Sequence, residues 1–512
     1  MARRRPLPRR PARWAMAATA GGVAVAGLAL AARARSGHRT GRRPLPLHLT
    51  ERRALHRTPV RARSRARRHL ELALLGSRAG ARFALHRARR TFAAVDRHAE
   101  LDEQFQLHTA GQVAEALGHM KGALMKIGQM ASYLDAGLPS PVREALGQLR
   151  QDAPPMAPEL AAAVVEAELG ALPERVFLQW DDHPIASASI GQVHRAITRE
   201  GRAVAVKVQY PGVDEAIRAD LDNAGMVFAG VGMLFPGLEP GPVVEELRAR
   251  LVEEVDYANE ARNQRLFADA YRGHPFIHVP DVMPELSTSR VLTTELAEGV
   301  RFEEMAAWSK SERDLAAEAI YRFVFRSLYR LSAFNGDPHP GNYLFRPGGQ
   351  VTFLDFGLVK HFSPDEVGVF GEMIRAMVID RDTRRYRELL RSAGLLQDGE
   401  AFSDEQVLEY FGHFYDFVME DREVTITPEW SRETVSRFFD PGGPHGEIAR
   451  AANLPPAFVI IQRINLGLFA ILGDLRATAN FRAIADELWP WVDGPPATEL
   501  GKLEADWLAN RR

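Results

Sequence analysis

The chain has 512 residues, of which 46% are hydrophobic, and its formal net charge is −1. It contains no cysteine, which excludes disulfides and cysteine-ligated zinc. The overall charge hides a division along the chain: residues 1–99 hold 25 arginines and three acidic residues, a net charge of +22, and the remainder carries −23. The sequence therefore predicts a basic arm followed by an acidic body with ample hydrophobic residues for a globular core.

The arm, residues 1–99, favours an anionic partner. A membrane surface, nucleic acid and the chain's own acidic body all fit this charge, and a disordered arginine-rich extension is the alternative. Residues 14–32 contain 19 positions without a charged side chain, close to the length that spans a bilayer. Most of them are alanine and glycine, so their insertion is marginal. We rank a weak membrane anchor first, a helix lying on an anionic surface second and a soluble tail third, and we disfavour nucleic acid.

Residues 100–154 predict a helical extension ahead of the acidic body. Hydrophobic residues recur at intervals of three and four between Leu117 and Leu134, which is the pattern of an amphipathic helix. Lys126, Gly128 and Gln129 lie beside this apolar stripe. By themselves, a lysine and a glutamine in this position indicate only a solvated flank.

A run of small residues precedes the first clear strand pattern. It reads Ala-Ser-Ala-Ser-Ile-Gly-Gln over residues 186–192, and a loop of small residues can cover bound phosphates. Alanine carries a Cβ and avoids positive φ, so this loop is expected to be stiffer than a glycine-rich loop. The candidate nucleotide contacts within it are Ala186, Ser187, Ala188, Ser189 and Ile190.

The next segment predicts a half-buried strand that carries one lysine. Residues 203–209 alternate valine with other residues, which is the period of a strand. Lys207 projects from one face of it, and lysine is rare here, with six against 59 arginines. A lysine in a strand commonly just reaches solvent. Together with the acidic residues further along the chain, Lys207 becomes a candidate partner of nucleotide phosphates.

A phosphate-binding lysine needs an acid that fixes its ammonium group. Residues 244–267 predict a continuous helix, and Glu260 on this helix is the best candidate partner. Glu254 and Asp256 fall on the same stretch, so spacing alone does not decide among the three acids.

A hinge between two lobes is predicted at residues 294–299. This segment follows a strand at residues 290–296 and precedes a helix that begins near Arg301. Its backbone, around Glu295 and Ala297, is expected to meet the edge of an adenine ring.

Two short motifs downstream supply the acidic and amide groups of a phosphoryl-transfer site. Asp337 begins an Asp-Pro-His-Pro-Gly-Asn run that ends at Asn342, and Asp355 begins an Asp-Phe-Gly triplet. This order and spacing suit an Asp337 that aligns a nucleophile while Asn342 and Asp355 hold magnesium against nucleotide phosphates. Each motif alone is weak, because Pro and Gly also mark ordinary turns.

These motifs, taken in order, resemble the UbiB-like (AarF-type) atypical kinase-like family. The resemblance covers roughly residues 110–361. It implies an α+β, two-lobed protein-kinase-like fold, with a small β-containing N-lobe, a helical C-lobe and a family-specific N-terminal helical extension. The residues that carry it are Lys126 to Gln129, Ala186 to Gln192, Val204 to Lys207, Glu254 to Asp256, Glu260, Asp337 to Asn342 and Asp355 to Gly357.

The resemblance also implies roles for these residues. Lys207 is expected to pair with Glu260, and Asp337 to occupy the catalytic aspartate position. The helix of Lys126 is expected to fold over the cleft and to bring its lysine to Glu254 and Asp256 as regulatory groups. Such a cover disfavours phosphorylation of proteins in trans.

The expected cofactors are ATP or ADP and Mg²⁺. The expected function is an ATPase or a small-molecule or lipid kinase that supports isoprenoid quinone or related lipid metabolism, with a lipid or isoprenoid-linked partner. The catalytic domain is expected on the cytoplasmic side of the membrane, either peripheral or held by a single N-terminal anchor. The alternative is a pseudokinase-like scaffold that binds nucleotide and organises a biosynthetic complex. Asn335 and Ser187 depart from the family pattern, which commonly has histidine and alanine there.

The expected domain organisation follows from these motifs. Residues 155–296 form the N-lobe, residues 297–480 the C-lobe and residues 481–512 a C-terminal tail. Residues 458–475 are strongly apolar but interrupted by polar side chains, so they predict a core helix rather than a membrane span. Trp489 and Trp491 are expected to pack against the large lobe.

Overall fold

The computed structural model describes residues 156–188, 190–214, 255–336, 338–396, 401–439, 443–453 and 455–511. All of them belong to one compact unit. Several expected features lie outside the described residues, namely the arm with residues 14–32, the extension with Lys126, Gly128 and Gln129, and the individual residues Ser189, Glu254 and Asp337.

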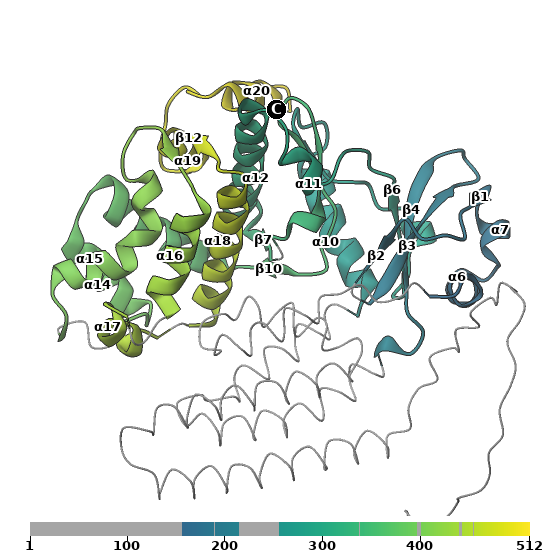
Figure 1. The fold of residues 1–512 in the computed structure, drawn as a ribbon, viewed down its shortest axis with the longest axis horizontal. Coiled ribbons are helices and arrows are strands. Elements are labelled where there is room, and N and C mark those ends of the chain that lie inside the picture. The colour runs from purple at the N-terminus through teal and green to yellow at the C-terminus, as the bar shows by residue number, and fades with distance from the viewer. Residues whose placement is uncertain are drawn as a thin grey trace, which may run out of the picture. The chain divides into compact units, whose positions relative to one another are not determined.

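Alternating valines build the sheet of the small lobe (Figure 1). Val204, Val206 and Val208 are buried, and Lys207 projects from the opposite face, so the predicted strand is confirmed. The sheet is antiparallel in the order β1-β3-β4-β6, with β2 added to β3. Its strands are β1 (Gln179–Trp180), β2 (Ala186–Ser187), β3 (Gly191–Ile197), β4 (Ala203–Gln209) and β6 (Val291–Glu295).

Two of the described helices cover the valine face of this sheet. They are α6 (Pro158–Leu169) and α7 (Pro173–Val176). Each begins with a proline, whose fixed φ and missing N–H suit the first turn of a helix. Val164 and Val165 of α6 pack with the valines of β4 in a small core of their own. The face that carries Lys207 is therefore left for the rest of the molecule.

The third helix of this region corrects one prediction. Helix α10 spans Tyr257–Ala270 and does not continue back through Asp256, where a continuous helix over residues 244–267 was expected. The backbone of Asp256 is extended, and its side chain accepts a hydrogen bond from the N–H of Ala258 at 3.0 Å. Aspartate favours this N-cap position because its carboxylate satisfies a helix N–H that lacks a partner within the helix. Asp256 therefore starts α10 instead of lying within it.

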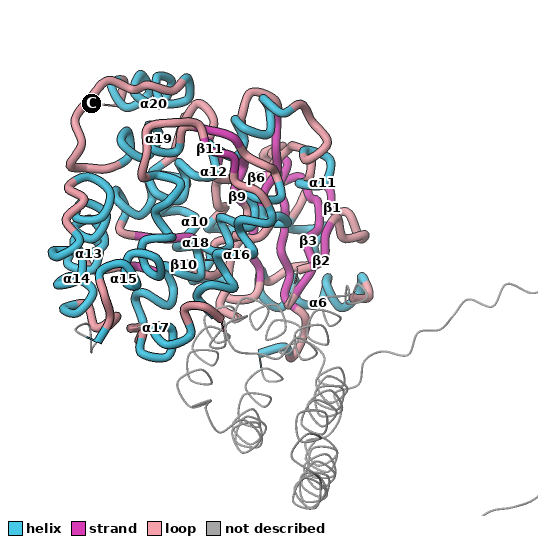
Figure 2. The backbone as a smooth tube through the Cα atoms, turned by 60° about the vertical axis from the view of Figure 1, so that its left-hand side comes forward, coloured by secondary structure: helices cyan, strands magenta, loops and turns pink. Residues whose placement is uncertain are grey.

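The large lobe is mainly helical and also contains small sheets (Figure 2). Two of its sheets hold the expected motifs: β5-β9-β8 and the antiparallel pair β7-β10. The elements up to β10 are β5 (Ile277–His278), η2 (Pro284–Leu286), α11 (Phe302–Met305), α12 (Lys310–Leu331), β7 (Ala333–Asn335), η3 (Pro340–Asn342), β8 (Tyr343–Arg346), β9 (Gln350–Phe353) and β10 (Val359–His361).

The remaining elements are nearly all helical, as predicted, apart from the short pair β11-β12. Ser363 and Ser403 start two of the helices with reciprocal capping boxes, in which the serine and a residue three positions on satisfy each other's backbone N–H groups. These elements are α13 (Pro364–Ile374), η4 (Arg375–Ile379), α14 (Thr383–Ser392), α15 (Asp404–Phe411), η6 (Gly412–Val418), β11 (Val424–Thr425), α16 (Pro428–Phe439), α17 (Gly446–Ala451), α18 (Pro456–Asp474), β12 (Thr478–Ala479), α19 (Phe481–Leu488) and α20 (Glu499–Ala509).

One hydrophobic core unites the large lobe. Ile464, Leu468 and Leu472 of α18 are buried in it, which confirms a core helix. Trp489 is buried there too, and Trp491 packs against the same core, as expected. Among the described residues, no helix combines the length and the apolar character needed to cross a bilayer.

Two segments reach this core from unexpected parts of the chain. Phe267 at the end of α10 packs within it, although the sequence boundary at residue 296 places α10 in the small lobe. Phe481 of α19 and Leu500 of α20 are also buried in it, within the segment expected to be a tail. Helix α10 therefore bridges the lobes, and the last described helices are part of the large lobe.

A buried charge cluster joins the C-terminal helices to α12. The guanidinium group of Arg322 is fully buried and donates to Glu318 at 2.8 Å, to Glu504 at 3.0 Å and to Glu487. Arg326 donates twice to Glu504, at 2.9 and 2.6 Å. Burial alone would raise the pKa of Glu504, but hydrogen bonds from His274 and Arg326 hold that pKa well below its ordinary value. The cluster fixes α20 against α12.

Candidate active site

The lysine of β4 and an acid of α10 meet in a buried ion pair. The Nζ atom of Lys207 lies 2.8 Å from both carboxylate oxygens of Glu260. The Lys207 side chain is 18% exposed and that of Glu260 only 3%. Burial alone would lower the pKa of Lys207, but the carboxylates of Glu260 and Asp355 raise it well above its ordinary value. Lys207 is therefore a permanent cation at the junction of the two lobes.

The structure decides which acid pairs with the lysine. The Asp256 carboxylate caps α10 and lies 3.8 Å from Arg262. Glu260 lies one turn further into α10, where its side chain points to β4. Glu254 lies outside the described residues. Of the two described candidates on this stretch, Asp256 and Glu260, it is Glu260 that pairs with Lys207.

Two contacts hold the start of α10 against the sheet. The side-chain amide of Gln209 donates to the carbonyl of Val255 at 2.8 Å, and the N–H of Tyr257 donates to Ser289 at 3.0 Å. The ring of Tyr257 also lies under Lys207, with Nζ 4.9 Å from the ring centroid, a cation–π geometry. These contacts fix the distance between β4 and α10, and with it the Lys207–Glu260 pair.

Gly191 is required at the same contact. A Cβ added there would lie 2.3 Å from the carbonyl oxygen of Val208 and 2.7 Å from the hydroxyl of Tyr257. Both distances are shorter than atoms tolerate, and one of the atoms is backbone. The sequence pattern gave Gly191 no role beyond its place in a small-residue loop. Its real constraint is the close approach of β3, β4 and α10.

The β8-β9 hairpin brings Asn342 and Asp355 together at one of its ends. Strands β8 and β9 pair with Tyr343 opposite Phe353, and beyond that pair the N–H of Leu354 donates to the carbonyl of Asn342 at 3.0 Å. Asn342 therefore lies just before β8 while Asp355 follows β9. Asp355 also lies 3.8 Å from the ammonium group of Lys207. The hairpin thus joins the downstream motifs to the ion pair.

The donor set fits magnesium by its chemistry. Mg²⁺ prefers carboxylate and amide oxygens and usually binds through one or two carboxylates together with waters and substrate phosphates. Asp355 supplies a carboxylate and Asn342 an amide oxygen from adjacent backbone segments. Within the described part of the chain, no group of three or more His, Asp or Glu residues forms a metal site. Two ligands from the protein would leave the other positions of such an ion to waters and substrate phosphates.

The Asp-Phe-Gly segment is clamped by side chains that the sequence did not single out as functional. Asn335 donates from its amide to the carbonyl of Asp355 at 2.7 Å. Asn263, three residues after Glu260 on α10, donates to the carbonyl of Phe356 at 3.2 Å. The Phe356 ring is fully buried, 5.0 Å from the ring of Phe267. Asn335, which stands where the family commonly has histidine, therefore holds the backbone of Asp355 through its side-chain amide.

The signal for these two asparagines was weak. Asn263 shares the face of α10 with Glu260, which only the i, i+3 spacing could have indicated.

Hydrogen bonding and close packing support the loop that leads to Asn342. His339 accepts a hydrogen bond from the N–H of Gly341 at 3.0 Å. A Cβ on Gly467 of α18 would lie 2.4 Å from Pro338, so that glycine allows α18 to reach this loop.

The small-residue loop forms a tight hairpin with β3. Ala186 pairs with Val193 and Ser187 with Gln192, and the N–H of Ala188 donates to Gly191 at 2.8 Å. Ile190 is buried, so its side chain belongs to the core. The side chain of Ser187 is exposed, and the stiffness expected of the alanines stays a prediction.

The predicted hinge connects β6 to α11. The N–H of Glu295 donates to the carbonyl of Asp281 at 2.8 Å, so this N–H is already engaged. A hydrogen bond with His278 lowers the pKa of the Glu295 carboxylate. The carbonyl of Glu295 also accepts a hydrogen bond, from the Thr294 hydroxyl at 3.3 Å, and the adenine contact expected at Glu295 and Ala297 stays a prediction.

Comparison with known proteins gives these features a family. The model of the ABC1 atypical kinase-like domain matches residues 148–390, a range that includes Lys207, Glu260, Asn342 and Asp355. A solved structure of Mycobacterium tuberculosis Rv3197 with erythromycin is 33% identical, with a TM-score of 0.57, and the match covers 78% of this chain and all of that one. The chain belongs to the ABC1 atypical kinase-like (UbiB/AarF) family.

Curated relatives agree with this membership of the ABC1 family. The chain is 33% identical to the atypical kinase COQ8B, mitochondrial, of Rattus norvegicus, over 58% of this chain and 57% of the rat protein. It is 30% identical to the atypical kinase COQ8, mitochondrial, of Saccharomyces cerevisiae, over 57% of this chain and 58% of the yeast protein. The chain thus spans little more than half the length of these relatives. The predicted family and the kinase-like, mixed helix-and-sheet fold are confirmed, and the roles of individual site residues stay predictions.

Proposed function

We propose that this protein binds ATP or ADP with Mg²⁺ and acts as an ATPase or as a kinase for a lipid or isoprenoid-linked small molecule. The observation that carries the proposal is the buried Lys207–Glu260 pair, with Asp355 only 3.8 Å from the same ammonium group. A permanent cation beside a carboxylate on a β-hairpin suits phosphates bridged by a metal ion. Names of its relatives support an atypical kinase.

The residues divide the work of phosphate binding. Lys207 faces the phosphates and Glu260 fixes its ammonium group, while the hairpin end presents Asn342 and Asp355 to Mg²⁺. When bound, the ion neutralises charge on the phosphates. Asn335 and the buried Phe356 ring hold the backbone of Asp355 in place. We assign Asp337, outside the described residues, the alignment of the nucleophile, as its position in the family motif implies.

Nucleotide binding and ATP turnover, measured side by side on the full chain, test the proposal. In the unmodified protein, the Asp355 carboxylate accepts a hydrogen bond from the N–H of Gly357 at 2.9 Å. Asp355→Asn keeps an oxygen that can accept this hydrogen bond but removes the negative charge. A bound metal supplies several kcal/mol of charge stabilisation, so turnover should fall on the order of 100-fold. Asp365→Asn, on the exposed first turn of α13, is the matched control and should leave turnover unchanged.

Lys207→Met tests the other half of the site. We expect weaker nucleotide binding, because the cation that faces the phosphates is lost, whereas Lys502→Met on the exposed face of α20 should bind nucleotide normally. Equal turnover in Asp355→Asn and in the unmodified protein would overturn the enzyme assignment. Nucleotide binding without any turnover in the unmodified protein would favour a scaffold instead.

The proposed pathway is isoprenoid quinone or related lipid metabolism at a membrane. In cells that lack the protein, we expect the isoprenoid quinone pool to fall and to recover with the intact chain but not with Asp355→Asn. The basic arm, residues 1–99, is proposed to bring the protein to the cytoplasmic side of an anionic membrane. Co-sedimentation with anionic vesicles should therefore weaken as the salt concentration rises. Vesicle binding that does not depend on the salt concentration would contradict an electrostatic role for the arm.

A further inference from the structure

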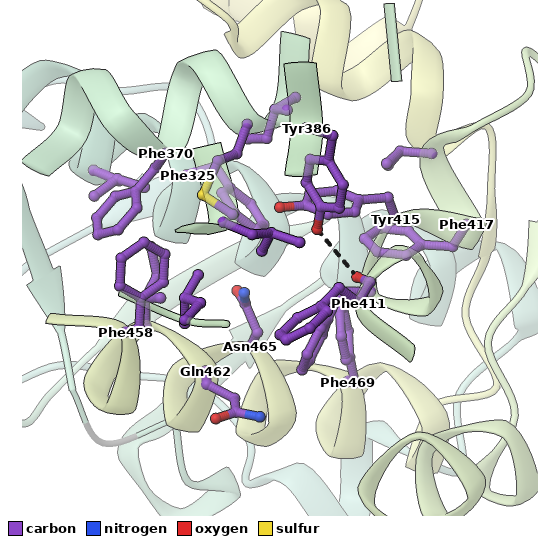
Figure 3. A pocket seen from close by; sticks show the side chains of 18 of the residues that line it. Phe325, Phe370, Tyr386, Phe411, Tyr415, Phe417, Phe458, Gln462, Asn465 and Phe469 are labelled. Atoms are coloured by element: carbon purple, nitrogen blue, oxygen red, sulfur yellow. Dashed lines mark hydrogen bonds between the residues drawn. The ribbon is translucent and has the colours of Figure 1, made fainter. Parts of the chain in front are cut away.

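The helical lobe contains a cavity whose lining differs from the charged residues around Lys207. Its volume is about 350 Å³, and it lies among α12, α13, α15, η6 and α18 (Figure 3). Its wall is mostly aromatic and aliphatic, and none of the described residues that line it carries a charge. A nucleotide or another phosphate compound would therefore lose its water there without gaining a counter-charge. The cavity suits an apolar molecule.

Aromatic residues make up 13 of the 24 residues that line the cavity. In Figure 3, Phe370 and Phe458 lie on one side and Phe411 and Phe469 on another, around a central space. Phe370 and Phe458 meet edge to face with ring centroids 5.1 Å apart. Well-packed interiors contain few voids larger than a water molecule, and a volume of this size falls within the range of small-molecule pockets. The shape is therefore that of a binding site rather than of a packing defect.

Asn465 gives the cavity a buried amide, in a wall that also contains Gln462 and five tyrosines. Asn465 lies one turn from both Ile461 and Phe469 on α18, and all three line the cavity. Figure 3 shows the Asn465 side chain directed toward the labelled aromatic rings. Its Oδ1 atom is buried and has no hydrogen-bond partner among the described residues. A buried amide oxygen without a partner costs free energy, so a ligand group that pairs with this amide would be bound preferentially.

We propose that this cavity binds a neutral, apolar alcohol of prenyl-alcohol size. The hydrocarbon part packs against the aromatic wall, and the hydroxyl pairs with the Asn465 amide. A hydroxyl both donates and accepts hydrogen bonds, so it can pair with whichever end of the amide faces the ligand. This site lies apart from the Lys207–Glu260 pair, and the proposal does not rest on the proposed ATP chemistry.

Equilibrium dialysis of the full chain with tritiated farnesol, delivered from cyclodextrin, tests the site. We expect saturable binding of one molecule per chain, which persists with saturating ADP and in Asp355→Asn. Farnesene, a hydrocarbon of the same length without the hydroxyl, should bind about fivefold more weakly. Asn465→Leu should remove this preference, so that the two ligands bind that variant equally.

Two alanines provide a matched pair of variants. Ala449 of α17 lines the cavity, and Ala449→Leu should weaken farnesol binding about tenfold by filling the space. Ala470 lies on the exposed face of α18, and Ala470→Leu should bind farnesol normally. Circular dichroism melting identifies any variant that fails to fold, and the farnesol–farnesene comparison needs no variant at all. Non-saturable binding, displacement by ADP, or equal affinity of Ala449→Leu and the unmodified protein would overturn the proposal.

Discussion

Replacing Arg322 by methionine tests the buried charge cluster between α12 and the C-terminal helices. Arg322 is fully buried and donates to Glu318, Glu487 and Glu504. With Arg326 included, the cluster carries a net charge of −1, and Arg322→Met makes it −2. Removing one partner of a buried ion pair costs about 3–5 kcal/mol, because the opposite charge stays buried without compensation. Three carboxylates are affected here, so we expect a loss of about 4 kcal/mol or more in the free energy of unfolding.

Urea unfolding followed by tryptophan fluorescence measures this loss. The matched control is Arg432→Met, which removes an arginine that is 74% exposed and lies 3.2 Å from Glu429. Exposed pairs contribute about 0–1 kcal/mol, so the control should unfold almost like the unmodified protein. Adding Glu487→Gln to Arg322→Met returns the cluster to −1 and should recover part of the loss. If Arg322→Met destabilised the protein no more than Arg432→Met, the reasoning about buried charge would be refuted.

Three further predictions follow from other contacts. Gly191→Ala forces its Cβ against the Val208 carbonyl; overpacking of this kind costs about 1–3 kcal/mol, so the melting temperature and nucleotide affinity should both fall. Asn335→Ala removes the hydrogen bond to the Asp355 carbonyl, and magnesium-dependent nucleotide binding measured by calorimetry should weaken while metal-free binding changes less. Burial holds the pKa of His274 below its ordinary value of 6.5, so the unfolded chain binds this proton more readily than the folded one. The contribution of His274 to the free energy of unfolding should therefore be constant above pH 6.5 and decrease below it. Urea unfolding across the same pH range should show a smaller loss of stability at low pH for His274→Gln than for the unmodified protein.

Local periodicity and motif order predicted the parts of the site that lie within single segments. The alternating valines around Lys207 fixed both the strand and the face on which the lysine projects. The order of the Asp337, Asn342 and Asp355 motifs predicted the kinase-like fold, which the family comparison confirmed. Each of these signals needs only the spacing of residues along the chain.

Contacts between distant segments could not be predicted in this way. Asp256 fits a helical pattern, but its carboxylate competes for a backbone N–H and starts the helix instead. The clamp from Asn335 joins residues 20 positions apart, and the clamp from Asn263 joins residues 93 apart. A single asparagine carries no periodic signal that would reveal such a partner. The cavity around Asn465 is likewise a product of how helices pack, and no linear motif encodes it.

The charge cluster also sets an order of events during synthesis. Arg322 precedes Glu487 by 165 positions and Glu504 by 182. At about 5–20 residues per second, α12 leaves the ribosome roughly 10 to 40 s before its last counter-charge exists. During that interval the guanidinium group of Arg322 has to stay in water, because burying it with too few carboxylates is unfavourable. The packing of α12 against α19 and α20 can therefore be completed only after the last helix has been synthesised.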